Sequence, residues 1–68
     1  SKAQNELELP QEAKVYSQMS SIHRSLGDYE QAFNYQMLAL SQHEIKNDSL
    51  GIANSYYNLG SIFFYQDQ

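Results

Sequence analysis

The sequence predicts an all-α fold made of antiparallel helix pairs. Helix breakers are scarce, since the 68 residues include only one proline and three glycines. Apolar residues recur at three- and four-residue steps in three segments, which is the pattern of amphipathic helices. Short polar breaks at residues 27–28 and 47–49 separate these segments. We therefore expect three helices joined by two tight turns.

The first predicted helix begins at Pro10 and ends at Gly27. Proline suits the first position of a helix because the N–H that it lacks would have no partner there. Glycine supplies the left-handed residue that often ends a helix. The expected inner face consists of Ala13, Tyr16, Met19, Ser20, His23 and Leu26. We interpret residues 1–9 as a linker or as the end of a preceding repeat.

The second predicted helix begins directly after Asp28, whose carboxylate can cap it, and ends near Ile45 and Lys46. Because the stop and start signals are adjacent, the first two helices must lie roughly antiparallel. The residues expected on its inner side are Ala32, Phe33, Met37, Ala39 and Leu40.

The third predicted helix follows the break at Asn47, Asp48 and Ser49, any of which can cap it. Its apolar positions are Ile52, Ala53, Tyr56, Leu59, Gly60 and Phe63. A glycine inside a helix costs about 1 kcal/mol relative to alanine. For that reason we expect a neighbouring helix to approach closely at Gly60.

A shift of 40 residues superimposes the third predicted helix on the first. The matched pairs are Ala13 and Ala53, Tyr16 and Tyr56, Met19 and Leu59, Ser20 and Gly60, Ser21 and Ser61, and Ile22 and Ile62. A period between 20 and 50 residues is typical of solenoids, in which each unit buries its apolar face on the next.

Several segments resemble the tetratricopeptide repeat family. The run Gly27-Asp28-Tyr29-Glu30-Gln31-Ala32 resembles the turn that opens the second helix of that repeat. Further matches are Tyr16, Met19 and Ser20 upstream, Ala39 and Leu40 downstream, and Tyr56, Asn58-Leu59-Gly60, Ile62 and Phe63 in the next unit. The resemblance covers residues 10–68.

The sequence departs from the family pattern at a few positions. Histidine replaces the usual aromatic residue at position 23, Gln36 occupies an expected apolar position, and Asp67-Gln68 stands where Gly-Asp is usual. The unit has 40 residues rather than about 34, and the added residues fall around Gln42 to Ser49. The stretch from Asp48 to Gly60 is similar to long repeats in bacterial signalling proteins and kinesin light chains.

The resemblance implies a tetratricopeptide-type α-solenoid, a right-handed superhelix, of which this chain supplies about one and a half repeats. Residues 10–46 would form the first helix pair and residues 47–68 the first helix of a second, truncated repeat. One side of the third helix would then be uncovered. We expect the natural protein to begin before Ser1 and to continue past Gln68, and the uncovered third helix also admits self-association.

The resemblance further implies a concave groove, lined by the first helix of each pair, that binds a protein or peptide partner. By register, its lining residues here are Lys14, Ser17, Ser21, Arg24, Ser25, Asn54, Tyr57, Asn58, Ser61, Phe64 and Tyr65. Tyr57, Phe64 and Tyr65 would anchor the partner, and Asn58 would hydrogen-bond its backbone. The lysine and asparagine that clamp a terminal carboxylate in some family members are replaced here by Ser17 and Ser21.

Composition argues against other functions. The net charge is −4 and the four basic residues are scattered, so no basic stripe is available for nucleic acid or an anionic membrane. No apolar run approaches the roughly 20 residues that span a bilayer. The absence of cysteine fits a reducing compartment such as the cytoplasm. His23 and His43 alone cannot form a zinc site; we expect a packed His23 and a surface His43.

Two functions are consistent with the sequence. The first is a protein–protein interaction module without enzymatic activity or a cofactor, since no nucleophile, phosphate loop or acid–base pair is recognisable. The second is a sensory or regulatory input domain of a larger bacterial signalling enzyme, such as a kinase or nucleotide cyclase.

Overall fold

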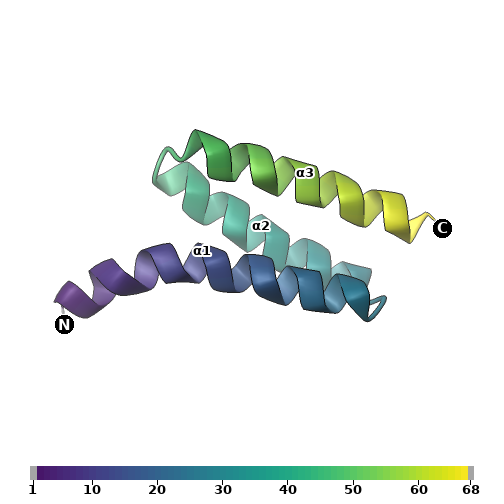
Figure 1. The fold of residues 1–68 in the computed structure, drawn as a ribbon, viewed down its shortest axis with the longest axis horizontal. Helices are drawn as coiled ribbons and strands as arrows, with labels where there is room; N and C mark the ends of the chain where they lie inside the picture. Colours follow the sequence, from purple (N-terminus) through teal and green to yellow (C-terminus); the bar gives the residue numbers. More distant parts are fainter. Residues whose placement is uncertain (1, 68) are drawn as a thin grey trace.

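Residues 2–67 fold into three helices that form two consecutive antiparallel pairs. The computed structural model describes the backbone of residues 2–67 and the side chains of residues 12–67. Helix α1 spans Lys2–Ser25, α2 spans Tyr29–Ile45 and α3 spans Ser49–Gln66. Figure 1 shows α1 and α3 running in the same direction, with α2 returning between them and lying further from the viewer. The all-α prediction is confirmed, and the described residues contain no β-strand.

The first helix is longer than the sequence predicted. It begins at Lys2 rather than at Pro10, so the backbone of residues 2–9 is helical. Proline inside a helix removes one backbone hydrogen bond. The residues before it include alanine, glutamine, glutamate and leucine, which are good helix formers. Pro10 therefore lies within α1 and does not mark its start.

The two turns repeat the same construction. A left-handed residue ends each preceding helix, namely Gly27 with φ of 80° and Asn47 with φ of 53°. The next residue is an aspartate that caps the following helix: Asp28 accepts from the Gln31 N–H, and Asp48 accepts from the Gly51 N–H. The capping predictions at both turns are thus confirmed.

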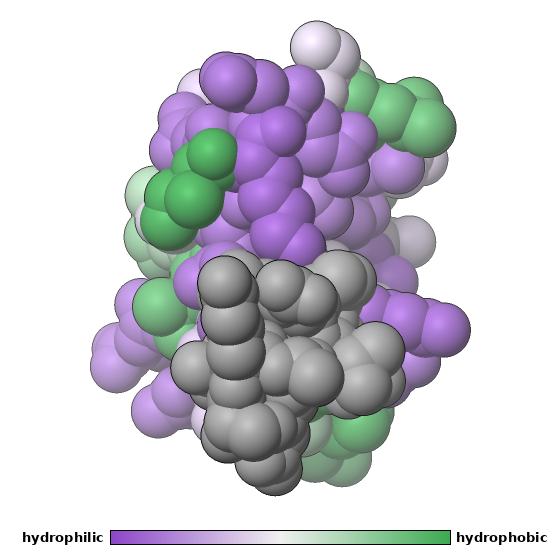
Figure 2. All heavy atoms as spheres, turned by 90° about the vertical axis from the view of Figure 1, so that its left-hand side faces the viewer, coloured by the Kyte–Doolittle hydropathy of each residue, from purple (hydrophilic) through white to green (hydrophobic). Residues whose placement is uncertain are grey.

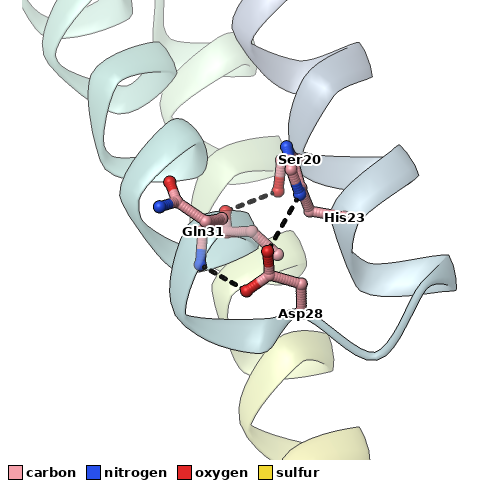
Figure 3. A network of polar contacts seen from close by, with 5 residues as sticks. Ser20, His23, Asp28 and Gln31 are labelled. Carbon is pink, nitrogen blue, oxygen red and sulfur yellow. Dashed lines mark hydrogen bonds and ion pairs between the residues drawn. The ribbon is translucent and has the colours of Figure 1, made fainter.

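At each turn a histidine contacts the capping aspartate, and this contact was not predicted from the sequence. His23 Nδ1 lies 3.2 Å from Asp28 Oδ2, and His43 Nδ1 lies 3.1 Å from Asp48 Oδ2. Figure 3 shows the first turn, where Asp28 reaches back to His23 with one carboxylate oxygen and to Gln31 with the other. In both pairs the histidine precedes the aspartate by five residues, and this shared spacing is the sequence signal from which the contact could have been predicted. Each aspartate therefore ties the end of one helix to the start of the next.

Helices α1 and α2 pack closely because small residues face each other. Ala32 and Ala39 are fully buried, and Ser20 is 2% exposed. The Ser20 hydroxyl donates a hydrogen bond of 2.7 Å to the Ala32 carbonyl across the interface (Figure 3). Beside it, His23 stacks on Tyr35 with 5.4 Å between ring centroids, which confirms His23 as a packed residue.

Helix α3 packs on α2 through a different face from the one predicted. Its buried residues are Gly51, Ser55, Leu59 and Ile62. Of the predicted stripe only Leu59 is buried, whereas Ala53, Tyr56, Gly60 and Phe63 are exposed and Ile52 is half-buried. Phe63 still reaches Phe33 of α2, at 5.5 Å between ring centroids. A solenoid helix contacts neighbours on two sides, and here α2 covers the side with the smaller residues.

Two further burial predictions need correction, and Gln36 is buried in the apolar position that it occupies. Leu26 is 74% exposed because it follows the last residue of α1, and Met37 is 40% exposed on the outer side of α2. Gln36 is only 1% exposed, and its Nε2 atom is buried without a hydrogen-bond partner among the described residues. The amide therefore fills the position where an apolar side chain was expected.

The two glycines of α3 should respond to alanine in opposite directions. At Gly51 a Cβ atom would overlap the His43 ring, whereas at Gly60 no atom of the described residues lies within 4 Å. Gly60→Ala should raise the free energy of unfolding by up to about 1 kcal/mol through helix propensity. Gly51→Ala should lower it by about 1–3 kcal/mol, because the ring must leave its place beside Asp48. Urea unfolding followed by circular dichroism measures both, and equal stabilisation by the two changes would contradict the His43 packing.

Candidate functional site

The surface between α1 and α3 carries the largest group of predicted partner-binding residues. A cavity of about 520 Å³ joins Ser17 of α1 to Asn54, Tyr57 and Asn58 of α3. His43, Asp48, Leu50, Gly51 and Ser55 complete its lining. The four residues named first were all predicted groove residues. Because α1 and α3 are separated by α2, their side chains converge on this shared surface only after folding.

A second hollow continues along α1 from the same serine. It has a volume of about 580 Å³ and is lined by Lys14, Ser17, Gln18, Ser21 and Ile22. Since Ser17 lines both cavities, the two form one continuous surface, which we call the α1–α3 groove. All five residues of the second hollow belong to α1, and they include the predicted groove residues Lys14 and Ser21.

A third, smaller cavity of about 210 Å³ is lined by Arg24, Ser25, Tyr29 and Tyr65 and shares no lining residue with the other two. The Arg24 guanidinium carbon lies 5.7 Å above the centre of the Tyr65 ring, so a cation–π contact connects α1 with α3. Tyr65 in turn meets Phe64 edge to face at 5.6 Å. The predicted residues Arg24 and Tyr65 are therefore close together.

Two predicted groove residues, Ser61 and Phe64, lie outside these three cavities. Ser61 is half-buried, and Phe64 is 61% exposed at the rim, where it leans on Tyr65. Tyr57 is 75% exposed although it lines the central cavity. The rings of Tyr57 and Phe64 are thus largely exposed to solvent.

The polar groups of the groove include two that are largely buried, Ser55 and His43. Ser55 is 1% exposed, and its Oγ atom has no hydrogen-bond partner among residues 12–67. His43 was expected at the surface, but its side chain is only 20% exposed because the ring packs over Gly51 and beside Asp48. Within the described part of the chain, no three His, Asp or Glu side chains gather as metal ligands would.

Charge is distributed unevenly over the groove. Lys14 and Arg24 bring positive charge from α1, whereas α3 contains no charged residue between Ser49 and Gln66. Asp48 is the acidic residue of the lining, and His43 lies against its carboxylate. Figure 2 views the end of the molecule that carries the α2–α3 turn, and that end is mainly hydrophilic with separate hydrophobic patches. Every helix among the described residues is too short or too polar to cross a bilayer.

Comparison with known proteins agrees with the two-turn, three-helix arrangement. The family model described as tetratricopeptide repeat matches residues 11–68, which is most of the chain. No curated protein and no solved structure gives a significant match to this sequence. Repeats of this family are protein–protein interaction scaffolds and are typically non-catalytic. The helix order, the two tight turns and the family match together show that the chain belongs to the tetratricopeptide repeat family.

Proposed function

We propose that the chain binds a peptide segment of another protein in the α1–α3 groove. The observation that carries this proposal is the central cavity, in which Ser17 of α1 faces Asn54, Tyr57 and Asn58 of α3. A cavity of about 520 Å³ lies within the size range of about 300–1,000 Å³ that is usual for ligand sites. It combines polar groups for the peptide backbone with an aromatic ring for a side chain.

The residues of the groove differ in what they can contribute to peptide binding. The amides of Asn54 and Asn58 can each donate to and accept from peptide backbone groups. Tyr57 and Phe64 are exposed aromatic rings of the kind that dominate binding energy at protein interfaces. We therefore assign orientation to the amides and affinity to the two rings.

The charges favour a peptide that is neutral or acidic. Lys14 and Arg24 each line one of the other two cavities, and the acid in the lining of the cavity of about 520 Å³, Asp48, faces His43. A carboxylate of the partner could meet either cation. A basic peptide would find one acid that is already paired.

Removing the aromatic rings of Tyr57 and Phe64 together should strongly weaken peptide binding. Peptides selected on the immobilised wild-type chain from a displayed random library provide the ligand, and fluorescence anisotropy measures its dissociation constant. Tyr57→Ala with Phe64→Ala should weaken binding at least about 30-fold, since a single interface hot spot contributes 2 kcal/mol or more. Helicity by circular dichroism should be unchanged because both rings are exposed.

A matched control is available one residue earlier in the same helix. Tyr56→Ala removes the same residue type as Tyr57→Ala, from a position that is 57% exposed on another face of α3, and it keeps Phe63, which packs against Phe33 of α2. This control should bind the selected peptides as the wild type does. If the wild type and the Tyr57/Phe64 variant bind the selected peptides with equal affinity, the proposal that peptides bind in the α1–α3 groove is wrong.

A further inference from the structure

The third cavity is lined by side chains that can all donate hydrogen bonds. Arg24 and Ser25 come from the last turn of α1, Tyr29 begins α2, and Tyr65 lies near the end of α3. Figure 1 shows that α1 and α3 end on the side of the molecule where α2 begins, so each helix contributes to the lining. Guanidinium and hydroxyl groups are donors that hold oxyanions in proteins. We call this site the Arg24 cavity.

The guanidinium of Arg24 is held in place without an acidic partner. Arg24 is half-buried, and its guanidinium carbon lies 5.7 Å from the centre of the Tyr65 ring. Among the side chains of residues 12–67, the ion pairs are formed by the histidines, and Arg24 takes part in none. Asp28, the nearest acid in sequence, is already engaged with His23 and with a backbone N–H of α2. The positive charge of Arg24 is therefore available to a ligand.

The repeat leaves the position of Tyr65 uncovered. Tyr65 corresponds to Ser25, which lies 40 positions earlier and is exposed although both α2 and α3 follow it. Helix α2 instead covers Ser20, whose counterpart in α3 is Gly60. A helix packed on α3 as α2 packs on α1 would therefore cover Gly60 and not Tyr65. The Arg24 cavity does not depend on the residues that come after α3.

Charge favours a carboxylate over a phosphate as the ligand of this cavity. Arg24 is the one cation of the described lining, and Glu30 and Asp67 lie within two residues of Tyr29 and Tyr65. A phosphate monoester carries a charge of about −1.5 to −2, which these acids and the net charge of −4 oppose. A carboxylate carries a single charge, and its two oxygens match the planar fork of one arginine.

We propose that the Arg24 cavity binds one carboxylate of the peptide that occupies the α1–α3 groove. The assignment rests on the proposed function, since the peptide brings the carboxylate to the cavity. A volume of about 210 Å³ is below the roughly 300–1,000 Å³ of most whole-ligand sites, so the cavity accommodates a single side chain or chain end. The carboxylate accepts two N–H groups of Arg24, and the hydroxyls of Ser25, Tyr29 and Tyr65 are the other donors around it.

The spacing of the cavities predicts where the carboxylate lies in the peptide. Ser17, Ser21 and Ser25 follow one another at steps of four residues, so they share a side of α1. Ser17 lines the central cavity, and Ser25 lies eight residues further on, which is about 12 Å along an α-helix. At about 3.3 Å per residue of extended peptide, the carboxylate should lie about three to five residues from the peptide residue that contacts Tyr57.

A double-mutant cycle between Arg24 and the peptide tests this proposal. Peptides selected on the wild-type chain from a displayed random library are synthesised with each Asp or Glu in turn replaced by Asn or Gln, and once with an amidated carboxyl end. Fluorescence anisotropy measures the dissociation constants. Arg24→Gln should weaken binding of the parent peptide about tenfold, but binding of the peptide that lacks one particular carboxylate less than about twofold. Arg24→Lys keeps the charge without the fork and should weaken binding of the parent about threefold.

Lys46→Gln is the matched control for Arg24→Gln. It removes the same charge from an exposed residue that lines none of the three cavities. The control should change the affinity of every peptide less than about twofold, because exposed charges contribute little. Helicity by circular dichroism should be unchanged in both variants, since neither side chain belongs to the buried core.

The cycle separates this proposal from the proposal of the groove. If Tyr57→Ala with Phe64→Ala weakens binding but Arg24→Gln affects all the peptides equally, the carboxylate site is wrong and the groove is retained. If Arg24 and one carboxylate are coupled but the Tyr57/Phe64 variant binds normally, the groove is wrong and the carboxylate contact is retained. A phosphoserine peptide that binds through Arg24 more than about tenfold tighter than the parent would assign the cavity to phosphate and overturn the proposal.

Discussion

Replacing Ile62 by alanine is expected to lower the free energy of unfolding by about 2–5 kcal/mol. Ile62 is 1% exposed and is the largest fully buried side chain, at the interface of α3 with α2. Its loss leaves a cavity that α3 cannot fill, because the neighbouring buried residues are Ser55 and Leu59, fixed on the same helix. A core of this size rarely supplies more than about 3–5 kcal/mol, so α3 should detach or the chain should unfold.

Ile22 provides the matched control for this substitution. It is the same residue type 40 positions earlier, at the same place in the repeat, but it is 53% exposed. Ile22→Ala should cost less than about 1 kcal/mol, since half of the side chain is already in water. Urea unfolding of both variants gives the comparison, and equal destabilisation would contradict the packing of α3 on α2.

Replacing Ala32 by leucine should disrupt the α1–α2 pair. Ala32 is fully buried, and its carbonyl accepts the Ser20 hydroxyl at 2.7 Å, so the two helices are in close contact there. A larger side chain must push α1 away. Overpacking costs about 1–3 kcal/mol, and loss of the buried hydrogen bond about 1 kcal/mol more.

The control for this change is Ala53→Leu, an exposed alanine inside α3. This control should change the free energy of unfolding by no more than about 0.5 kcal/mol. Thermal unfolding of the two variants would show whether the close approach of α1 to α2 at Ala32 makes a larger side chain destabilising there. A leucine that is tolerated equally at both positions would be inconsistent with the packed α1–α2 interface.

The helices and turns could be predicted from the sequence because their signals are local. Gly27 and Asp28 mark one turn, and Asp48 caps the next helix, through interactions that span only three to five residues. The start of α1 was misplaced because proline is tolerated both at a helix start and, at a cost, inside a helix. The preference of proline alone therefore could not show whether the helix begins at Pro10 or earlier.

The packed face of α3 could not be predicted from apolar periodicity. Ser55 and Gly51 are buried there, whereas Tyr56 and Phe63, the larger apolar residues, remain exposed. A hydrophobic pattern identifies the side with the most apolar area, but a solenoid helix has two packed sides. Which of them α2 covers depends on the fit of small residues, and that fit becomes visible only in three dimensions.

The candidate groove was predicted in part. Residues three and four apart share a helix face, so the spacing of Ser17 and Ser21, or of Asn54 and Asn58, already placed each pair together. The buried Ser55 hydroxyl and the His43–Asp48 pair were missed, because their positions depend on contacts between helices and across a turn. The role of the groove residues in binding stays a prediction.

The most direct test of binding through the α1–α3 groove is a titration of the isotope-labelled chain with a library-selected peptide, followed by amide NMR shifts. We expect the largest shift changes at Ser17 of α1 and at Asn54 and Asn58 of α3, which line the central cavity. Changes concentrated instead on the outer residues of α2, such as Asn34 and Leu38, would contradict binding in the groove.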